Sequence, residues 1–356
     1  MRRNLTIITS CAVLLLAAGI AAGLKSGAEI FQSNPRPRHH DENGFRNLAP
    51  DFKPHNKGFG FLKWQWDRVR GKAPEKPKSY DFKIAPNHDA LLQTGAENLR
   101  VTWIGHATTL VQMEGVNILT DPMFSERCSP VSFAGPKRKM PPAPAFENLP
   151  RIEVVMISHN HYDHLDKSTI EKLGNGPRYF VPLYLGKFLR DLGIKKENIV
   201  ELDWWQAAEF RGLQFHCTPT QHFSGRGLHD TNQVLWCSWA VKGERHGFYF
   251  GGDTGYFSGF EEIGEKLGPF DLAILPIGAY LPRWFMAPVH VDPAQALQAY
   301  LDVRAEKMLA IHWGTFDLAD EPMDQPPKDL RTAAEALGIN QEKIWVFQHG
   351  ETREVN

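Results

Sequence analysis

The segment ISHNHYDHLD, residues 157–166, directly follows the apolar run IEVVM and holds three histidines and two aspartates. An apolar run of this kind predicts a strand that is buried on both faces. The spacing His-x-His puts the rings of His159 and His161 on the same side of an extended segment, and a turn then brings Asp163 and His164 to a second position. Because neutral imidazole and carboxylate are zinc-type ligands, the segment predicts a rigid loop with four ligands for two adjacent metal ions.

Two metal ions need more ligands than one loop supplies, and three other strand ends offer them. FHCTPTQHFSG presents His222, FYFGGDTGY presents Asp253, and MLAIHWGTF presents His312. Taken singly, each of these residues is explained as readily by a cap or by a satisfied hydrogen-bonding group. Together with the loop they complete a set of seven candidate ligands: His159, His161, Asp163, His164, His222, Asp253 and His312.

The chain from residue 99 onward is organised as one layered domain. Short β-branched runs such as LRVTWIG and QVLWCSWAV (residues 233–241) alternate with helical patterns such as KSTIEKL and PAQALQAYLDV. No linker separates the two mixed β-α halves, which predicts a single α/β domain. Hydrophobic residues make up 42% of the chain and the formal net charge is −1. The chain is therefore globular, and without a global electrostatic field we expect no nucleic-acid partner.

The N-terminus predicts a different environment. Arg2 and Arg3 precede Leu5–Leu24, an uncharged stretch rich in Leu, Ile and Ala. About 20 apolar residues match the thickness of a bilayer core, and the same stretch resembles a secretory signal. Both alternatives predict a membrane-associated protein with a periplasmic or otherwise extracytoplasmic catalytic domain. The expected organisation is a signal peptide or membrane anchor over residues 1–24, a polar linker or arm over 25–57 and a catalytic domain over 58–356.

The segment GFGFLKWQWDRVRGK, residues 58–72, mixes four aromatic rings with four cationic side chains. Two interpretations stay open. The segment is an interfacial element, with rings at headgroup depth and cations on phosphate, or it packs against the core of the domain.

Several motifs carry a resemblance to a known family. HNHYDHLD, with TQH, GGDTG and IHWG, resembles the metallo-β-lactamase superfamily. Further blocks, among them VTWIGHATTLV, ELDWW, PIGAYLPRWFM, HVDPAQA and AIHWGTF, resemble its N-acylphosphatidylethanolamine-hydrolysing phospholipase D branch over roughly residues 45–355. The resemblance implies the metallo-β-lactamase fold, a four-layer αββα sandwich, for the domain at 58–356.

The same resemblance implies roles for individual residues. One zinc ion is expected on His159, His161 and His222, the other on Asp163, His164 and His312, and Asp253 is expected to bridge the two. Asp121 matches an early aspartate that lies near the metals, where a carboxylate orients a ligand histidine. The expected catalytic residues are Asp163, Asp253 and His290, while His106 and Trp284 are expected to contact substrate or to support the ligands.

The implied activity is a phospholipase D-type hydrolysis. Two cations that share a water lower its pKa toward neutrality, so a metal-bound hydroxide is expected to attack the phosphorus of N-acyl phosphatidylethanolamine. The products are phosphatidic acid and an N-acylethanolamine, and the expected partner is a phospholipid at a membrane surface. The alternatives are a hydrolase of another phosphodiester, ester or lactone on the same scaffold, and a non-catalytic metal- or lipid-binding protein. Histidine and carboxylate also tolerate iron or manganese, and the oligomeric state, with a homodimer as one option, stays open.

Overall fold

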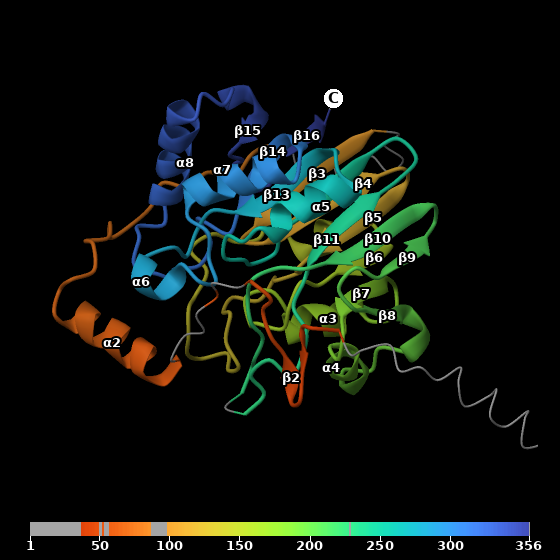
Figure 1. Ribbon diagram of the computed structural model, residues 1–356, viewed down its shortest axis with the longest axis horizontal. Helices are drawn as coiled ribbons and strands as arrows, with labels where there is room; N and C mark the ends of the chain where they lie inside the picture. Colours follow the sequence, from red (N-terminus) through yellow and green to blue (C-terminus); the bar gives the residue numbers. More distant parts are fainter. Residues whose placement is uncertain (1–36, 50–51, 53–56, 87–97, 228, 356) are drawn as a thin grey trace, which may run out of the picture. The chain divides into compact units, whose positions relative to one another are not determined.

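The structure is a computed structural model that describes residues 37–49, 52, 57–86, 98–227 and 229–355. The described residues from Asp41 onward belong to one compact unit. Its centre is a pair of seven-stranded sheets (Figure 1). In spatial order, the first sheet contains β16 (Thr352–Val355), β3 (Leu99–Gly105), β4 (Thr108–Met113), β5 (Val116–Thr120), β6 (Val154–Met156), β7 (Arg178–Pro182) and β8 (Ile199–Leu202). The second contains β15 (Ile344–Trp345), β14 (Ala305–Ile311), β13 (Phe270–Pro276), β12 (Gly247–Phe250), β11 (Ser238–Lys242), β10 (Leu213–Thr218) and β9 (Ala207–Phe210).

The two sheets pack face to face through alternate residues of their strands. Trp103 of the first sheet shares a fully buried cluster with Trp239 and Ile274 of the second. The neighbours of these residues point the other way, because successive side chains in a strand face opposite sides. In β13, for example, Leu275 lies in a separate cluster on the outer face of the second sheet. Each sheet therefore needs a covering layer on its outer face.

Helices supply both outer layers. Helices α5 (Gly259–Leu267), α7 (Pro293–Asp302) and α8 (Gln325–Ala336) cover the second sheet, with Phe260, Leu297 and Leu330 packed into its outer cluster. Helices α3 (Lys167–Leu173) and α4 (Gly186–Asp191) cover the first sheet through Ile170 and Leu189. The order helix, sheet, sheet, helix is the αββα architecture that the family resemblance implies, and the structure confirms it (Figure 1).

Helix α2 (Lys57–Val69) lies beside the short helix α6 (Arg283–Met286) and buries only one face. The Trp64 ring packs in a small cluster with Met286, and its Nε1 donates to Asp320 Oδ2 at 2.9 Å. On the other side of the helix, Leu62 and Trp66 are 68% and 56% exposed. The segment therefore packs on the domain, as one of the two interpretations expected, and it also presents an exposed apolar surface. A role at a lipid interface stays a prediction.

The prediction of a membrane-associated protein with an extracytoplasmic catalytic domain, held by an N-terminal signal or anchor, is corrected by the structure. Within the described residues, no helix is long and apolar enough to cross a membrane. The longest, α2, has 13 residues, whereas a span needs about 20. The stretch Leu5–Leu24, from which the prediction was drawn, lies outside the described residues.

Candidate metal centre

The seven candidate ligands converge because their loops follow the C-terminal ends of four strands. The loop with His159, His161, Asp163 and His164 follows β6, and the loops with His222, Asp253 and His312 follow β10, β12 and β14. Strands β12 and β14 run parallel to their shared neighbour β13, so their carboxyl ends meet at one edge of the sheet. Five of the seven candidate ligands are buried, and the other two, His161 and Asp163, are partly exposed.

Three histidines form the first group. His159 Nε2 lies 2.8 Å from His161 Nδ1, which lies 3.3 Å from His222 Nε2. Burial lowers the pKa of His161 to about 4 and holds the pKa of His159 and His222 well below the usual value. All three rings are therefore neutral near pH 7. Ring nitrogens brought this close suit a shared cation, because neutral imidazole is a common metal ligand.

The rings of this group are oriented from behind by hydrogen bonds. The Ser158 hydroxyl donates to Asp121 Oδ2 at 2.6 Å, so it accepts from His159 Nδ1 at 2.9 Å. His222 Nδ1 lies 2.9 Å from the carbonyl oxygen of Val289 and donates to it. In both rings the Nδ1 position carries the proton, which leaves Nε2 as the ligand atom.

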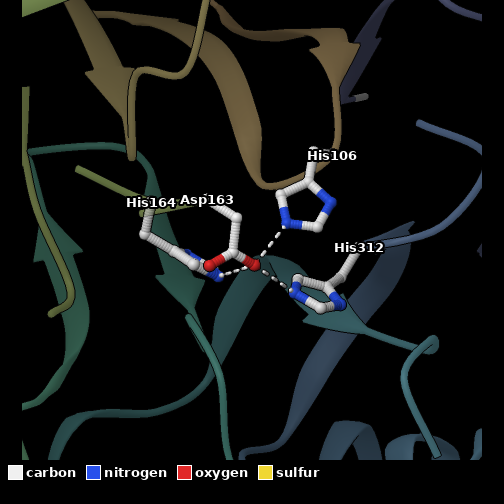
Figure 2. A group of neighbouring side chains, drawn as sticks. All are labelled: His106, Asp163, His164 and His312. Carbon is white, nitrogen blue, oxygen red and sulfur yellow. Dashed lines mark hydrogen bonds and ion pairs between the residues drawn. The ribbon is translucent and has the colours of Figure 1, made fainter. Parts of the chain in front are cut away.

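The second group consists of Asp163, His164 and His312, and a third ring lies beside the same carboxylate, as Figure 2 shows. Asp163 Oδ2 lies 3.4 Å from His164 Nε2 and 3.5 Å from His312 Nε2. The third ring is His106, whose Nε2 lies 2.9 Å from the same oxygen (Figure 2). Asp121 Oδ2 lies 2.7 Å from His164 Nδ1, so this buried carboxylate orients a ring of the second group as well as Ser158.

Asp253 lies between the two groups. Its carboxylate oxygens lie 3.2 Å from Nε2 of His164 and 3.2 Å from Nε2 of His312. On the other side, its Oδ2 lies 3.8 Å from His222 Nε2. One carboxylate thus faces ligand atoms of both groups, which is the geometry expected of a bridging residue.

The second group is electrostatically unlike the first. Burial alone lowers the pKa of His164 and His312, but the carboxylates beside them reverse this effect. The pKa of His312 is raised to about 9, and that of His164 is raised well above its usual value. Burial likewise raises the pKa of Asp163 and Asp253, but the adjacent His164 charge lowers both well below the usual value. The carboxylates of Asp163 and Asp253 therefore favour positive charge in this group.

The donor set fits metal ions. Among the described residues, His164 Nε2, His312 Nε2 and Asp253 Oδ1 are buried and have no hydrogen-bond partner. Buried polar atoms normally have partners, and these three converge on one point between the carboxylates. A cation would satisfy all of them at once, and carboxylate with imidazole is a donor set that zinc, iron and manganese accept.

The other predicted residues lie at different distances from this centre. His290 Nδ1 is buried, 4.0 Å from Asp253 Oδ2, with no hydrogen-bond partner among the described residues. Trp284 lies in α6, 47% exposed, where Lys63 Nζ lies 3.8 Å from the centre of its ring. The structure thus places His290 at the metal centre and Trp284 at the surface next to α2.

Three residues that support the centre were not found from the sequence. Arg226 Nη1 donates to the carbonyl oxygens of Asn160 and Leu165, at 2.9 and 2.8 Å, and so holds both ends of the ligand loop. Asn47 exchanges two hydrogen bonds with the backbone of His222, at 2.7 and 3.1 Å. Neither residue stands in a recognisable motif, and Asn47 is 175 positions from its partner.

The third, Glu321, supports the segment PIGAYLPR. Its carboxylate accepts hydrogen bonds from the backbone N–H groups of Ala279 and Leu281, at 2.6 and 2.9 Å. A side chain at Gly278 would come within 2.1 Å of the carbonyl oxygen of His312, so only glycine fits there. The segment is therefore held directly against a ligand of the second group.

Comparisons with known proteins agree with this geometry. The family model described as Beta-lactamase superfamily domain matches residues 116–313. The chain is 46% identical over 255 residues to the N-acyl-phosphatidylethanolamine-hydrolyzing phospholipase D 1 of Caenorhabditis elegans, covering 67% of this chain and 71% of that protein. It is 35% identical over 249 residues to the mitochondrial N-acyl-phosphatidylethanolamine-hydrolyzing phospholipase D of Saccharomyces cerevisiae, covering 67% and 52%.

A solved structure supports the fold alone. The isothiocyanate hydrolase from Delia radicum gut bacteria superposes with a TM-score of 0.58 at 20% identity, over 71% of this chain and 98% of that one. The seven converging side chains and the identity to the worm protein carry the assignment further. The chain is a metal-dependent hydrolase that belongs to the metallo-β-lactamase superfamily, in the branch that includes the N-acylphosphatidylethanolamine-hydrolysing phospholipases D.

Proposed function

We propose that this protein is a dizinc phosphodiesterase that hydrolyses N-acyl phosphatidylethanolamine to phosphatidic acid and an N-acylethanolamine. The observation that carries the proposal is the pair of ligand groups joined by Asp253, together with 46% identity to a relative named for this reaction. His159, His161 and His222 would hold one ion, and Asp163, His164 and His312 the other. Two bound divalent cations would activate a water at working pH and neutralise the negative oxygens of the phosphodiester.

The reaction transfers the phosphatidyl group from the ethanolamine oxygen to the oxygen of water. A new bond forms between water oxygen and phosphorus, the bond from phosphorus to the ethanolamine oxygen breaks, and the proton of the water passes to the departing alcohol. His290 is buried beside Asp253, and its Nδ1 has no hydrogen-bond partner among the described residues. In the proposed reaction it would hydrogen-bond a phosphodiester oxygen or carry that proton. Burial lowers the pKa of His290 to about 4, so its ring is neutral near pH 7.

The surface around α2 supports a phospholipid substrate presented by a lipid surface. Leu62, Trp66 and Val69 are 68%, 56% and 79% exposed, and Trp284 of the neighbouring α6 is 47% exposed. Residues 58–72 carry four cationic side chains, Lys63, Arg68, Arg70 and Lys72. Aromatic and aliphatic side chains mixed with cations suit the boundary between lipid headgroups and acyl chains.

The test is hydrolysis by the full chain in water enriched in oxygen-18. The protein is loaded with zinc and incubated with N-acyl phosphatidylethanolamine in mixed micelles, and the lipids are analysed by mass spectrometry. We expect N-acylethanolamine to accumulate, with the heavy oxygen only in phosphatidic acid. Release of diacylglycerol would contradict the phospholipase D reaction. Rapid hydrolysis of a water-soluble ester or lactone without any N-acylethanolamine would favour the alternative hydrolase.

A further inference from the structure

His106 is a buried histidine that lies beside the second group without being one of the seven candidate ligands. It stands in the turn between β3 and β4 of the first sheet. The sequence leaves two roles open for it, contact with substrate or support of the ligands. Only 1% of its surface is exposed, so almost none of it is open to a substrate. Its contacts within the protein therefore indicate its role.

The ring of His106 donates a hydrogen bond to the carboxylate of Asp163. The two atoms, His106 Nε2 and Asp163 Oδ2, lie 2.9 Å apart (Figure 2). Burial raises the pKa of Asp163, but the adjacent His164 charge lowers it by more, so the carboxylate is ionised near pH 7 and can only accept. The proton of this bond is therefore on Nε2. Burial lowers the pKa of His106 to about 3, so its ring is neutral, and the nitrogen that faces the second group has no lone pair for a metal ion.

The backbone of His106 binds a second ligand residue. The N–H of His312 donates to the carbonyl oxygen of His106 at 3.0 Å. Trp103 Nε1 donates to the same oxygen at 2.9 Å, and the N–H of His106 donates to Thr315 Oγ1 at 2.8 Å. Since Thr315 lies three residues after His312, the turn that carries His106 is bonded twice to the loop that carries this ligand.

These contacts join ligand residues that come from different sheets. Asp163 belongs to the loop after β6 of the first sheet, and His312 to the loop after β14 of the second. Asp163 Oδ2 and His312 Nε2 lie 3.5 Å apart. His106 holds Asp163 through its side chain and His312 through its backbone, so one residue links two ligands of the second group across the two sheets.

The backbone is strained at both ends of the link to His312. His106 and His312 have φ values of 54° and 63°, in the left-handed region that residues other than glycine seldom adopt. Such a conformation persists only where surrounding contacts hold it, and it is typical of functional sites. The hydrogen bond between these two residues is one of the contacts that hold it here.

We propose that His106 is a positioning residue for the second metal ion. Its Nε2–H holds Asp163 and its carbonyl oxygen holds His312 in the arrangement that the ion requires, while its ring neither binds the ion nor contacts substrate. The inference rests on the function proposed above only in that the second group binds a metal ion, and it does not depend on the substrate. Loss of the ring hydrogen bond should weaken the second ion about 10- to 100-fold and leave the first ion unchanged.

Three substitutions in the full chain separate positioning from metal ligation. His106→Gln places an amide N–H near the position of Nε2, His106→Phe keeps a ring without an N–H, and His106→Asn has an amide that is too short to reach Asp163. The Asn variant is the control for the backbone, because Asn adopts left-handed conformations readily. Zinc affinity is measured by competition with a chromogenic chelator, without substrate. We expect His106→Gln to stay close to the unaltered protein, and the Phe and Asn variants to bind the second ion about 10- to 100-fold more weakly.

Nuclear magnetic resonance of the histidine rings gives a second readout that does not depend on the folding of any variant. In zinc-loaded protein labelled with nitrogen-15, we expect the His106 proton to stay on Nε2, with the signal assigned by its absence from His106→Phe. A metal-bound Nε2, or a loss of the second ion in His106→Gln as large as in His106→Phe, would make His106 a ligand and overturn the proposal. Unchanged zinc affinity in all three variants would overturn it as well. If the protein binds both ions but releases no N-acylethanolamine, the proposed function fails while this inference stands.

Discussion

The two ligand groups lie side by side yet differ in charge. The first consists of three neutral imidazoles, whose pKa values burial holds low. The second combines Asp163 with His164 and His312, whose pKa values the carboxylates raise. Asp253 faces both groups. In the proposed dinuclear centre, the carboxylates would therefore supply the negative charge for two cations, while the first group would contribute ligand atoms alone.

The largest effect on both ligand groups is expected at Asp253, the residue that faces both. Asp253→Asn keeps the size of the side chain and removes its charge, so both ions should bind more weakly. We expect hydrolysis to fall by more than about 100-fold, beyond the range for residues that only orient a ligand. Metal content and lipid hydrolysis are measured together, with circular dichroism to confirm the fold. Full activity in this variant would contradict the bridging role.

Single-group variants should separate the two ions. His161→Ala removes a ligand of the first group, and His312→Ala removes one of the second. We expect each variant to retain about one metal equivalent per chain and to lose hydrolysis, because the proposed chemistry needs both cations. Metal analysis of the two purified proteins, side by side, is the measurement. If either variant loses both ions, the groups are not separate sites.

Residues behind the ligands should have intermediate effects that differ between the groups. Asp121→Asn weakens the orientation of His164, and Ser158→Ala removes the hydroxyl that accepts from His159. We expect metal affinity to fall about 10- to 100-fold in each variant, as is usual for such partners. Because Asp121 contacts His164 directly, Asp121→Asn should weaken the second ion more than the first. Competition with a chromogenic chelator measures the two affinities, and equal losses at both ions would contradict this difference.

The smallest effect is expected at Asn47. Asn47→Ala removes two hydrogen bonds to the backbone of His222 but no ligand atom. We expect a loss of stability of about 1–3 kcal/mol, from about 0.5–1.5 kcal/mol for each bond, and a modest weakening of the first ion only. Urea unfolding gives the stability. Glu42→Ala, an exposed change in the same segment, serves as the control, and an equal effect there would contradict a specific role for Asn47.

The ligand loops could be predicted from the sequence because their polar residues interrupt apolar strands. The alternation of strand and helical patterns also predicted a layered α/β domain, which the structure confirms. The run QVLWCSWAV shows where such reasoning fails, since only the strand Ser238–Lys242 forms at its end. Trp236 and Cys237 are apolar because they are buried beneath the ligand loops, where Trp236 Nε1 donates to the carbonyl oxygen of Thr220 and the Cys237 N–H to that of Ser158.

The hydrogen bonds that support the ligand loops could not be predicted from the sequence, for a different reason. Asn47 and Arg226 act through backbone groups of distant loops, and a backbone partner leaves no mark in the residue pattern. Helix α8 was not predicted either, because Pro326 and Pro327 suggest a turn. Proline is nonetheless favoured in the first turn of a helix, where its missing N–H is not needed.

A zinc titration of the metal-depleted full chain tests directly whether the two ligand groups form one dinuclear centre. Bound metal and hydrolysis of N-acyl phosphatidylethanolamine are followed in the same samples. If the two groups form one dinuclear centre, binding should stop at two equivalents per chain, and activity should rise only as the second ion binds. Full activity at one equivalent, or no binding beyond one, would contradict a dinuclear hydrolase.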